Sequence, residues 1–239
     1  MQSISSSLAD EPVFYAGKYP AFVIDNNEDL MKKAIELSAQ NFHQINELQK
    51  LVQKKYDAPL ETYLDYFTKS FPAKISVGGE VYGVLDPDNG NLVACFSMNR
   101  YGNKYKLEGI SKNWEVSGFL VAKLAEILNG KYDDYAYFGH IAVNQEYKGQ
   151  GIFMKMVMSW GEYIKKTHPS FKGLAAFVTA PQTMRYYFEN GWKNLGQLNY
   201  ESIIIDGKKF LDFEIENLDI YIDKVPASYA VSYDFVSDQ

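Results

Sequence analysis

Two glycines, Gly149 and Gly151, stand in the stretch "EYKGQGIFMKM" (146–156), between an apolar run and a helical pattern. A strand, a glycine turn and a helix together can bind an anion. The first N–H groups of a helix are unpaired, the helix dipole adds positive potential, and glycine lets a phosphate approach the backbone. The stretch matches neither the G-x-G-x-x-G nor the G-x-x-x-x-G-K-[ST] pattern. Taken alone, it is equally compatible with an ordinary strand-to-helix turn.

Other residue types that often carry chemistry are sparse. The one cysteine, Cys95, lies in the apolar run "NLVACFSM", which favours a buried, unreactive thiol over a nucleophile. The three histidines, His43, His140 and His168, have no spacing typical of metal ligands. The sequence therefore predicts no metal site.

The composition is that of a folded chain with one domain of ordinary size. Of the 239 residues, 46% are hydrophobic and 23% are charged. A formal net charge of −6 disfavours a nucleic-acid partner, which needs clustered Lys and Arg. No run of about 18 apolar residues occurs, and the N-terminal "MQSISSSLADEPVF" has no signal-peptide core. We therefore expect a soluble intracellular protein, cytoplasmic by default, with no membrane partner.

The elements around the glycine turn follow a mixed α+β order. Hydrophobic periodicity and turn residues predict the sequence β-α-α-β-β-α-β-α-β-α-β-β. The expected strands lie at 19–25, in a hairpin across 80–99, at 135–143, at 173–179 and in a hairpin around Asp206-Gly207. The expected helices begin at Asn26 or Asn27 (continuing to about Leu48), after Pro59, at 114–130, after the glycines and after Pro181.

Three regions are expected along the chain. Residues 1–15 form a flexible leader, residues 16–224 form the folded domain, and residues 225–239 form a polar C-terminal tail. A last strand-like piece, "LDIYID", precedes this tail.

The glycine stretch resembles the acetyl-CoA motif of the GNAT superfamily of N-acetyltransferases. In that family a strand ending in Val is followed by Arg/Gln-x-x-Gly-x-Gly/Ala at a helix start. The alignment puts Lys148 in the Arg/Gln position, Gly151 at the central glycine and Phe153 at the final Gly/Ala, while Gly149 matches a common extra glycine. Two of the three defining positions depart from the pattern. The ring of Phe153 either turns away toward the sheet or narrows the phosphate site.

A second segment, "AFVTAPQTMRYYFENGW", resembles the next GNAT segment, a strand followed by Asn-Pro-x-Ala and Leu-Tyr-Glu-x-x-Gly-Phe. Pro181 and Gly191 match, Tyr187 falls on the family tyrosine, Trp192 replaces the Phe and Ala180 replaces the Asn. The likeness covers roughly residues 18–216. It implies an α+β (α/β layered) GNAT fold. Its central mixed, mostly antiparallel sheet has about seven strands flanked by helices and is splayed between the fourth and fifth strands.

A finer resemblance is to insect-type arylalkylamine (dopamine-type) N-acetyltransferases. "DAPLETYLDYF" is similar to their Asp-Glu-Pro-Leu segment, and "LNYESIIIDGKKF" is similar to their Tyr-x-Asp-Tyr hairpin. Their Glu assists deprotonation, but Ala58 stands there and only Asp57 remains. Thr179 and Thr183 correspond to the two serines of that group.

The resemblance implies acetyl-CoA as co-substrate, no metal, and roles for particular residues. Tyr187 would protonate the leaving thiolate, because a phenol with a pKa of about 10 stays protonated at neutral pH; the alternative is a core aromatic. Tyr137, Thr179 and Thr183 would face the acceptor. The acetyl-CoA contacts would come from Ile141, Ala142, Val143, Lys148, Gly149, Gln150, Gly151, Ile152 and Phe153.

The base that deprotonates the amine is not defined by the sequence. The fourth-strand position that some family enzymes use for it is Tyr137, a poor base. Strand alternation places His140 on the opposite face from Tyr137 and Ile141, so a structural histidine is favoured. Asp57 is a second candidate, although a solvated loop carboxylate is an equally good interpretation.

Two functions follow from these residues. The first is an acetyl-CoA-dependent N-acyltransferase that acts on a small primary amine, with arylalkylamines among the candidate acceptors. The alternative is a catalytically impaired GNAT-fold protein that serves as a binding or structural subunit with a protein partner. The departures at Phe153, Ala180 and Ala58 favour the alternative.

Overall fold

The computed structural model describes residues 11–128, 130–205, 207–211 and 227–235. The strands are β1 (Phe14–Ala16), β2 (Tyr19–Val23), β3 (Glu80–Leu85), β4 (Leu92–Arg100), β5 (Tyr135–Val143), β6 (Gly173–Val178), β7 (Lys193–Asn199), β8 (Ile204–Ile205), β9 (Lys208–Lys209) and β10 (Ala227–Asp234). The helices are α1 (Glu28–Gln44), α2 (Glu47–Tyr56), α3 (Leu60–Ser76), α4 (Lys112–Leu128), α5 (Ile152–Thr167) and α6 (Pro181–Glu189). Short 3₁₀ turns follow β5 (η2, Gln145–Tyr147) and β7 (η3, Tyr200–Ser202).

Eight strands form one sheet in the order β1-β2-β3-β4-β5-β6-β10-β7. Every neighbouring pair is antiparallel except β5 and β6, which run parallel in the middle of the sheet. The expected mixed, mostly antiparallel sheet is therefore confirmed, with eight strands in place of about seven. Strands β8 and β9 form a separate small hairpin.

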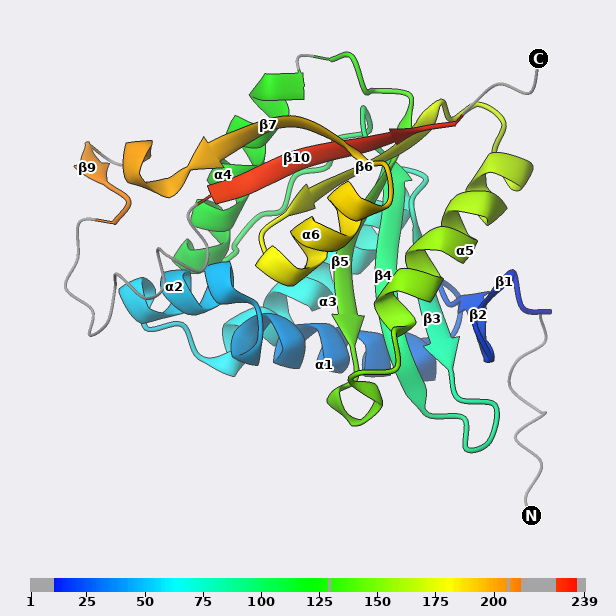
Figure 1. The fold of residues 1–239 in the computed structure, drawn as a ribbon. Coiled ribbons are helices and arrows are strands. Elements are labelled where there is room, and N and C mark those ends of the chain that lie inside the picture. The colour runs from blue at the N-terminus through cyan, green and yellow to red at the C-terminus, as the bar shows by residue number, and fades with distance from the viewer. Residues whose placement is uncertain (1–10, 129, 206, 212–226, 236–239) are drawn as a thin grey trace.

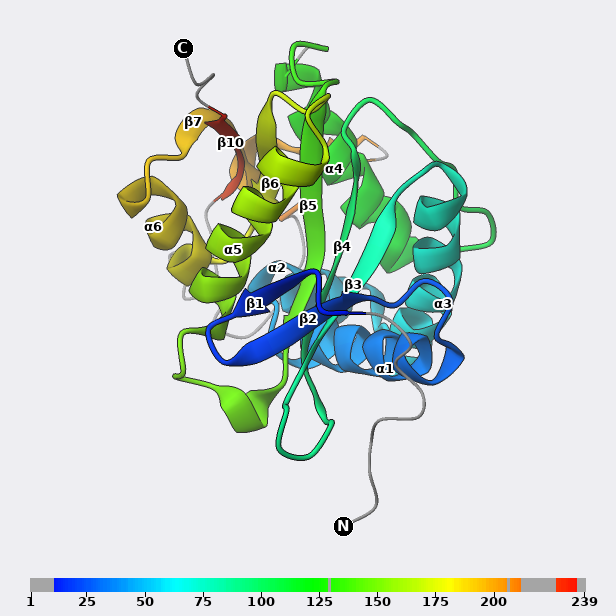
Figure 2. The ribbon, with the colours of Figure 1, turned by 90° about the vertical axis from the view of Figure 1, so that its right-hand side faces the viewer.

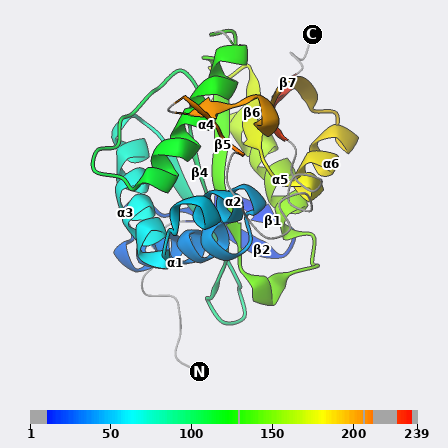
Figure 3. The ribbon, with the colours of Figure 1, turned by 90° about the vertical axis from the view of Figure 1, so that its left-hand side faces the viewer.

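Helices cover both faces of the sheet. Helices α5 and α6 lie on one face (Figure 1), and α1 to α4 lie on the other, where Figure 3 shows them toward the viewer. The largest apolar cluster joins α5 and α6 to the sheet around Trp160 and Phe138, whose rings stack at 4.8 Å. A second cluster joins α1 and α3 to the opposite face around Phe67 and Trp114. Figure 2 shows the sheet from its side, with β1 and β2 crossing beside α5.

The first helix begins where the sequence indicates, but it ends earlier. The Asn27 side chain accepts a hydrogen bond from the N–H of Leu30 at 3.0 Å and caps α1. The predicted helix to Leu48 is instead two helices. Asn46 breaks the pattern because its side chain accepts from the N–H of Gln49 and caps α2.

The polar tail expected at 225–239 is wrong for residues 227–234. These residues form β10, which pairs with β6 on one side and β7 on the other (Figure 1). Its sequence "ASYAVSYD" mixes small, apolar and polar residues, most of them buried. Both of its edges carry backbone hydrogen bonds that a tail would leave to water. The strand-like piece at 218–223 lies outside the described residues.

Among the described residues, no helix is both long and apolar enough to cross a lipid bilayer.

Candidate functional site

The parallel strands β5 and β6 separate soon after they meet. Their register covers only Tyr135 to Tyr137 against Gly173 to Ala175. β5 continues to Val143 paired with β4, but its other edge has no strand partner beyond Tyr137 among the described residues. Backbone N–H and C=O groups need partners when they are buried. The opened edge, which includes Ile141 to Val143, therefore lacks the strand partner that β6 provides up to Tyr137.

The glycine turn lies at the end of β5 and opens α5. Gly149 and Gly151 adopt φ values of 83° and 67°, the left-handed region that favours glycine. Gly151 is the N-cap residue and provides no side-chain cap, so the first N–H groups of α5, from Ile152 onward, have no intrahelical acceptor. A Cβ added at either glycine would meet nothing within 4 Å. The turn is therefore open toward solvent, as an anion site requires.

The glycine turn is held by hydrogen bonds from Tyr19 of the β1–β2 hairpin and from Lys155 of α5. The Tyr19 hydroxyl donates to the Oε1 of Gln150 at 2.5 Å, and Lys155 donates to the Gln150 carbonyl at 3.2 Å. The side chain of Gln150 thus points toward β2, and only its backbone is presented by the turn. Lys148 is exposed beside the glycines.

Phe153 turns its ring toward α6. The ring packs edge-on against Tyr186 at 5.4 Å and against Tyr187 at 5.9 Å, and it is partly buried against the largest apolar cluster. It lies between the start of α5 and the middle of α6. A ligand that runs from the glycine turn to Tyr187 would therefore meet this ring.

Tyr187 has a buried hydroxyl without a partner. The residue is 1% exposed, its ring packs against Trp192 at 4.5 Å, and no described group hydrogen-bonds its oxygen. Burial raises the pKa of the phenol, and the neighbouring Tyr186 and Tyr137 raise it further. Tyr187 is therefore a protonated donor that lacks an acceptor.

Tyr137 lies at the separation of β5 and β6, on the opposite face of the sheet from Tyr187. Its ring leans along β5 toward Gly139, so that a Cβ added at Gly139 would lie 3.0 Å from the Tyr137 Cε1 atom. The ring also contacts Phe177 at 5.4 Å. Burial raises the pKa of this phenol too. Tyr137 also contributes to the raised pKa of Tyr187, so the two rings lie near each other where β5 and β6 separate.

His140 does not face away from Tyr137, so the alternation argument is wrong for it. A bulge puts two residues of β5, His140 and Ile141, opposite one residue of β4, and His140 takes a φ of 53°. Its ring therefore joins the α1–α3 face, where Nε2 bonds the Tyr66 hydroxyl at 3.2 Å and Nδ1 lies 3.4 Å from the Ser97 Oγ. His140 therefore has the hydrogen-bonded environment expected of a structural histidine, but on the same face of the sheet as Tyr137.

The remaining expected residues are not all brought together. Asp57 is exposed, ends α2 in a left-handed conformation, and makes no described contact with Tyr137 or Tyr187. The Thr179 hydroxyl accepts from the Asn46 side chain at 3.4 Å, which ties the end of β6 to the junction of α1 and α2. The Thr183 hydroxyl donates to the Ala180 carbonyl at 2.8 Å and stabilises the start of α6.

Sequence reasoning missed Lys74, which lies on the same face as Tyr137. The side chain is buried, and its Nζ donates to the Ser97 Oγ at 2.6 Å and lies 5.5 Å from the Tyr137 ring centre. The spacing of Phe67 and Phe71 was the available signal, because Lys74 falls on the same helix face as these rings.

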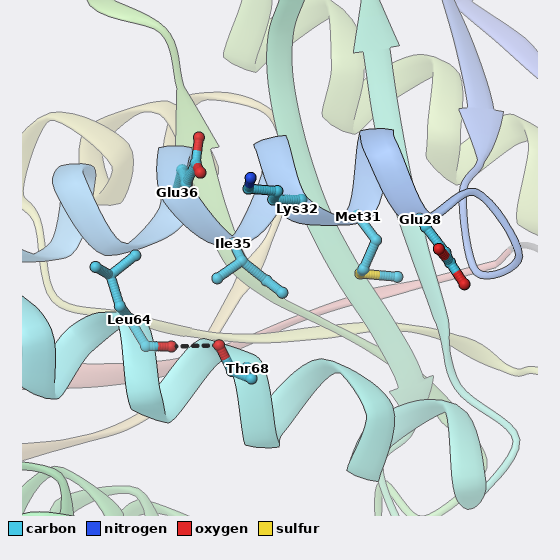
Figure 4. A pocket seen from close by; sticks show the side chains of 7 residues that line it. All are labelled: Glu28, Met31, Lys32, Ile35, Glu36, Leu64 and Thr68. Atoms are coloured by element: carbon cyan, nitrogen blue, oxygen red, sulfur yellow. Dashed lines mark hydrogen bonds between the residues drawn. The ribbon is translucent and has the colours of Figure 1, made fainter.

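Two grooves on the described surface lie beside α1. Figure 4 shows the first, between α1 and α3, where Met31 and Ile35 of α1 point toward α3 and Leu64 of α3 points toward α1; Glu28 and Glu36 of α1 also line it. The second runs along α1 toward the loop before η2 and is lined by Lys33, Glu36, Leu37, Gln40, Asn41, Gln44, Ile45, Asn91, Leu92, Asn144 and Gln145. Among the described residues, no group of three or more His, Cys, Asp or Glu could hold a metal ion.

The geometry is similar to that of several solved structures. The C-terminal condensation domain of Ebony, in complex with beta-alanyl-dopamine, superimposes with a TM-score of 0.71 at 14% identity, covering 91% of this chain and 99% of that one. Arylalkylamine N-acetyltransferase 2 from Aedes aegypti gives 0.62 at 14% identity, covering 91% and 99%. The chain has the GNAT fold. An apo form of agmatine N-acetyltransferase gives 0.61 at 9% identity, covering 90% and 99%. No family model and no curated protein matches the sequence.

Within the GNAT fold, the separation of β5 and β6 is the predicted splay. The extra strand β1 accounts for the shift in numbering from the fourth and fifth strands. The glycine turn and Tyr187 lie on the α5–α6 face of this splay, while Tyr137 lies on the α1–α4 face.

Proposed function

We propose that the protein is an acetyl-CoA-dependent N-acyltransferase that moves an acetyl group to a small primary amine by direct attack in a ternary complex. The observation that carries the proposal is the buried, unpartnered hydroxyl of Tyr187. A buried donor without an acceptor costs roughly 1–3 kcal/mol. A leaving thiolate beside Tyr187 would supply the missing acceptor.

The open glycine turn supports the same proposal. The free N–H groups after Gly151 would hold the diphosphate of the co-substrate, and Lys148 would add positive charge. Phe153 departs from the small residue that a close approach favours, so its ring would have to move. The residues therefore fit the co-substrate at the turn and at Tyr187, with one side chain to displace between them.

The residues divide the chemistry between the two faces of the sheet. The amine nitrogen forms a bond to the thioester carbonyl carbon while N–H groups on the open edge of β5 donate to the carbonyl oxygen. The carbon–sulfur bond then breaks, and the Tyr187 hydroxyl gives its proton to the sulfur and recovers one from solvent. The nitrogen loses one proton, so the products are an amide and a free thiol.

Tyrosines on the α1–α4 face of the sheet, where we place the acceptor, support an aromatic amine. Tyr66, Tyr101, Tyr105 and Tyr137 lie on the α3 side of the splay. The Tyr101 and Tyr137 rings are 6.0 Å apart, and Tyr105 contributes to the raised pKa values of Tyr66 and Tyr137. Such rings can stack on an arylalkyl group and attract its ammonium. An arylalkylamine is therefore the acceptor class we propose.

The second candidate is a GNAT-fold protein without turnover that acts as a subunit of an assembly. The specific observation in its favour is the Phe153 ring, which lies between the glycine turn and Tyr187. A chain in which that ring cannot move would not bind acetyl-CoA. The two candidates therefore differ in a single binding measurement.

Isothermal titration calorimetry with acetyl-CoA tests the proposal on the wild type and on Gly151→Trp. We expect micromolar binding by the wild type and at least tenfold weaker binding by the variant, because the indole would fill the open turn. Gly78→Trp is the matched control, since Gly78 is also exposed, has a φ of 81° and has nothing within 4 Å of its Cβ position. No binding by the wild type at millimolar acetyl-CoA would overturn the enzyme and favour the subunit.

Replacement of Phe153 by Ala is expected to strengthen acetyl-CoA binding about tenfold. The ring must leave its contacts with Tyr186 and Tyr187 when the ligand enters, and aromatic pairs contribute about 0.5–1.5 kcal/mol each. Calorimetry on Phe153→Ala measures the change. Phe188→Ala is the control, because Phe188 lies on α6 next to Tyr187 but packs on Tyr229. Weaker binding by Phe153→Ala would mean that the ring helps to hold the ligand.

A further inference from the structure

Lys74 is a buried lysine without an ionic partner. It is 1% exposed near the end of α3, and the ion pairs found among the described residues do not include it. Its Nζ has one side-chain hydrogen bond, to the Ser97 Oγ at 2.6 Å. A buried ammonium in this setting is unfavourable, so the neutral amine is favoured.

A chain of polar side chains leads away from this amine. The Ser97 Oγ lies 3.4 Å from the Nδ1 of His140 and donates to the Gly139 carbonyl oxygen at 3.1 Å. The His140 Nε2 bonds the Tyr66 hydroxyl at 3.2 Å. The chain therefore runs from Lys74 through Ser97 and His140 to Tyr66.

The β5 bulge makes this chain possible. His140 has a positive φ, which is uncommon for a residue other than glycine and strains the backbone. The strained conformation turns the imidazole onto the α3 face, between Ser97 on β4 and Tyr66 on α3. Rings enclose it from α1 and α3, with Phe42 at 6.1 Å and Phe67 at 5.2 Å. Exclusion of water in such an enclosure strengthens each polar contact.

The chain meets the splay at Tyr137. The Nζ of Lys74 lies 5.5 Å from the Tyr137 ring centre, and Tyr137 is the last residue of β5 that pairs with β6. Ser97 pairs with Gly139 in the sheet, at the point where the open edge of β5 begins. The proposed acid, Tyr187, approaches the same splay from the α5–α6 face. A proton acceptor and a proton donor thus lie on opposite sides of one opening.

No carboxylate is among the groups that shift the pKa values of this cluster. The titratable side chains around it are Lys74 and Tyr66 on α3, Tyr101 and Tyr105 after β4, and Tyr137 and His140 on β5. Burial lowers the pKa of Lys74 to about 7. Burial, followed by the charge on Lys74, lowers the pKa of His140 well below its usual value. Both groups are therefore available as neutral proton acceptors near neutral pH.

We propose that Lys74 is the terminal acceptor of the proton that the attacking amine loses, reached through Tyr66, His140 and Ser97. The inference rests on the proposed acetyl transfer and supplies the base that the site otherwise lacks. The amine proton passes to the Tyr66 oxygen as the Tyr66 proton passes to the His140 Nε2. The Ser97 hydroxyl turns from the Gly139 carbonyl toward the neutral Lys74 amine. The Nδ1 proton then passes to the Ser97 Oγ, and the Ser97 proton passes to the Lys74 Nζ. The resulting ammonium then releases the proton to solvent, and His140, now protonated at Nε2, must return to its Nδ1–H tautomer before the next turnover.

The pH profile of turnover tests the proposal, with acetyl-CoA and 2-phenylethylamine as substrates. Wild-type kcat/KM should rise through pH of about 7, because Lys74 accepts a proton only when it is neutral. In Lys74→Met this acidic limb should disappear and kcat/KM should fall about 100-fold at pH 8, with acetyl-CoA affinity unchanged within twofold. Lys74→Arg, which keeps a charge but cannot deprotonate, should lose activity equally. Lys69→Met is the control, because Lys69 is exposed on the same helix and pairs with Asp65.

A second measurement follows Lys74 directly and needs no acceptor. The ε-carbon NMR signal of Lys74 in ¹³C-lysine-labelled protein, assigned by its absence from Lys74→Met, should titrate near pH 7. A signal that stays in the charged position to pH 9 would overturn the proposal, as would an unchanged acidic limb in an active Lys74→Met. If the wild type binds acetyl-CoA but acetylates no amine, the proposed function fails together with this role. If Lys74→Met stays active and keeps the acidic limb of its pH profile, the proposed role of Lys74 is wrong while the proposed function stands.

Discussion

Replacement of Tyr187 by Phe is expected to lower the turnover number about 10²- to 10³-fold while it raises the free energy of unfolding. The hydroxyl is the proposed proton donor to the leaving thiolate, and general acids contribute about 10²- to 10⁴-fold. In the unliganded protein the same hydroxyl is buried without a partner. Its removal relieves a desolvation cost of roughly 1 kcal/mol. If Tyr187 served only the core, its replacement by Phe would not lower the turnover number, and turnover and stability would not change in opposite directions.

Steady-state kinetics, calorimetric acetyl-CoA binding and chemical unfolding of the same variant check this expectation. Tyr186→Phe is the matched control, because the Tyr186 hydroxyl donates to the Met154 carbonyl at 3.3 Å. That variant should keep its turnover and lose up to about 1 kcal/mol of stability, the usual net value of one hydrogen bond. Unchanged turnover in Tyr187→Phe would show that the thiolate takes its proton from elsewhere, and a loss of stability would show that the hydroxyl has an acceptor.

Replacement of Gly173 by Ala is expected to cost more than 3 kcal/mol of folding free energy. Gly173 begins β6 and pairs with Tyr135 of β5 on one side and Asp234 of β10 on the other. A Cβ there would lie far inside van der Waals contact with the Tyr233 carbonyl oxygen and 2.6 Å from the Tyr135 Cε1. The first of these groups is backbone and cannot rotate away. Overpacking alone costs about 1–3 kcal/mol, and displacement of a strand adds the loss of its hydrogen bonds.

Urea unfolding of Gly173→Ala measures this effect, and Gly118→Ala provides the comparison. Gly118 lies inside α4 with nothing within 4 Å of its Cβ position, so its replacement should add about 0.5–1 kcal/mol through helix propensity. Equal stabilities of the two variants would mean that β6 can shift without cost. Because Gly173 lies just before the splay, any Gly173→Ala that does fold should also bind acetyl-CoA more weakly.

Local signals predicted much of the fold because they act over a few residues. The cap at Asn27, the hairpin across 80–99 and the glycine-led start of α5 each depend on neighbours in sequence, and the structure contains all three. β10 was missed because a strand held by backbone pairing on both edges needs no continuous apolar run. Its partners, β6 and β7, lie far back in the chain.

The candidate site was predicted less completely than the fold. The glycine turn and the place of Tyr187 follow from motif spacing, whereas the direction of the Phe153 ring depends on α6, a separate segment. His140 was assigned to the wrong face because a bulge adds one residue and inverts the alternation after it. Lys74 was overlooked because lysine is usually solvated, although its helix face is otherwise aromatic.

The late position of β10 in the chain has a consequence for synthesis. On the ribosome, β5 and β6 leave the exit tunnel well before residues 227–234, so β6 has an exposed edge until the last strand emerges. Domains generally fold as units during translation, and unpaired strand edges promote association between chains. The nascent chain is therefore most exposed to misassembly in the interval between the emergence of β6 and that of β10. Chaperone binding should concentrate in that interval.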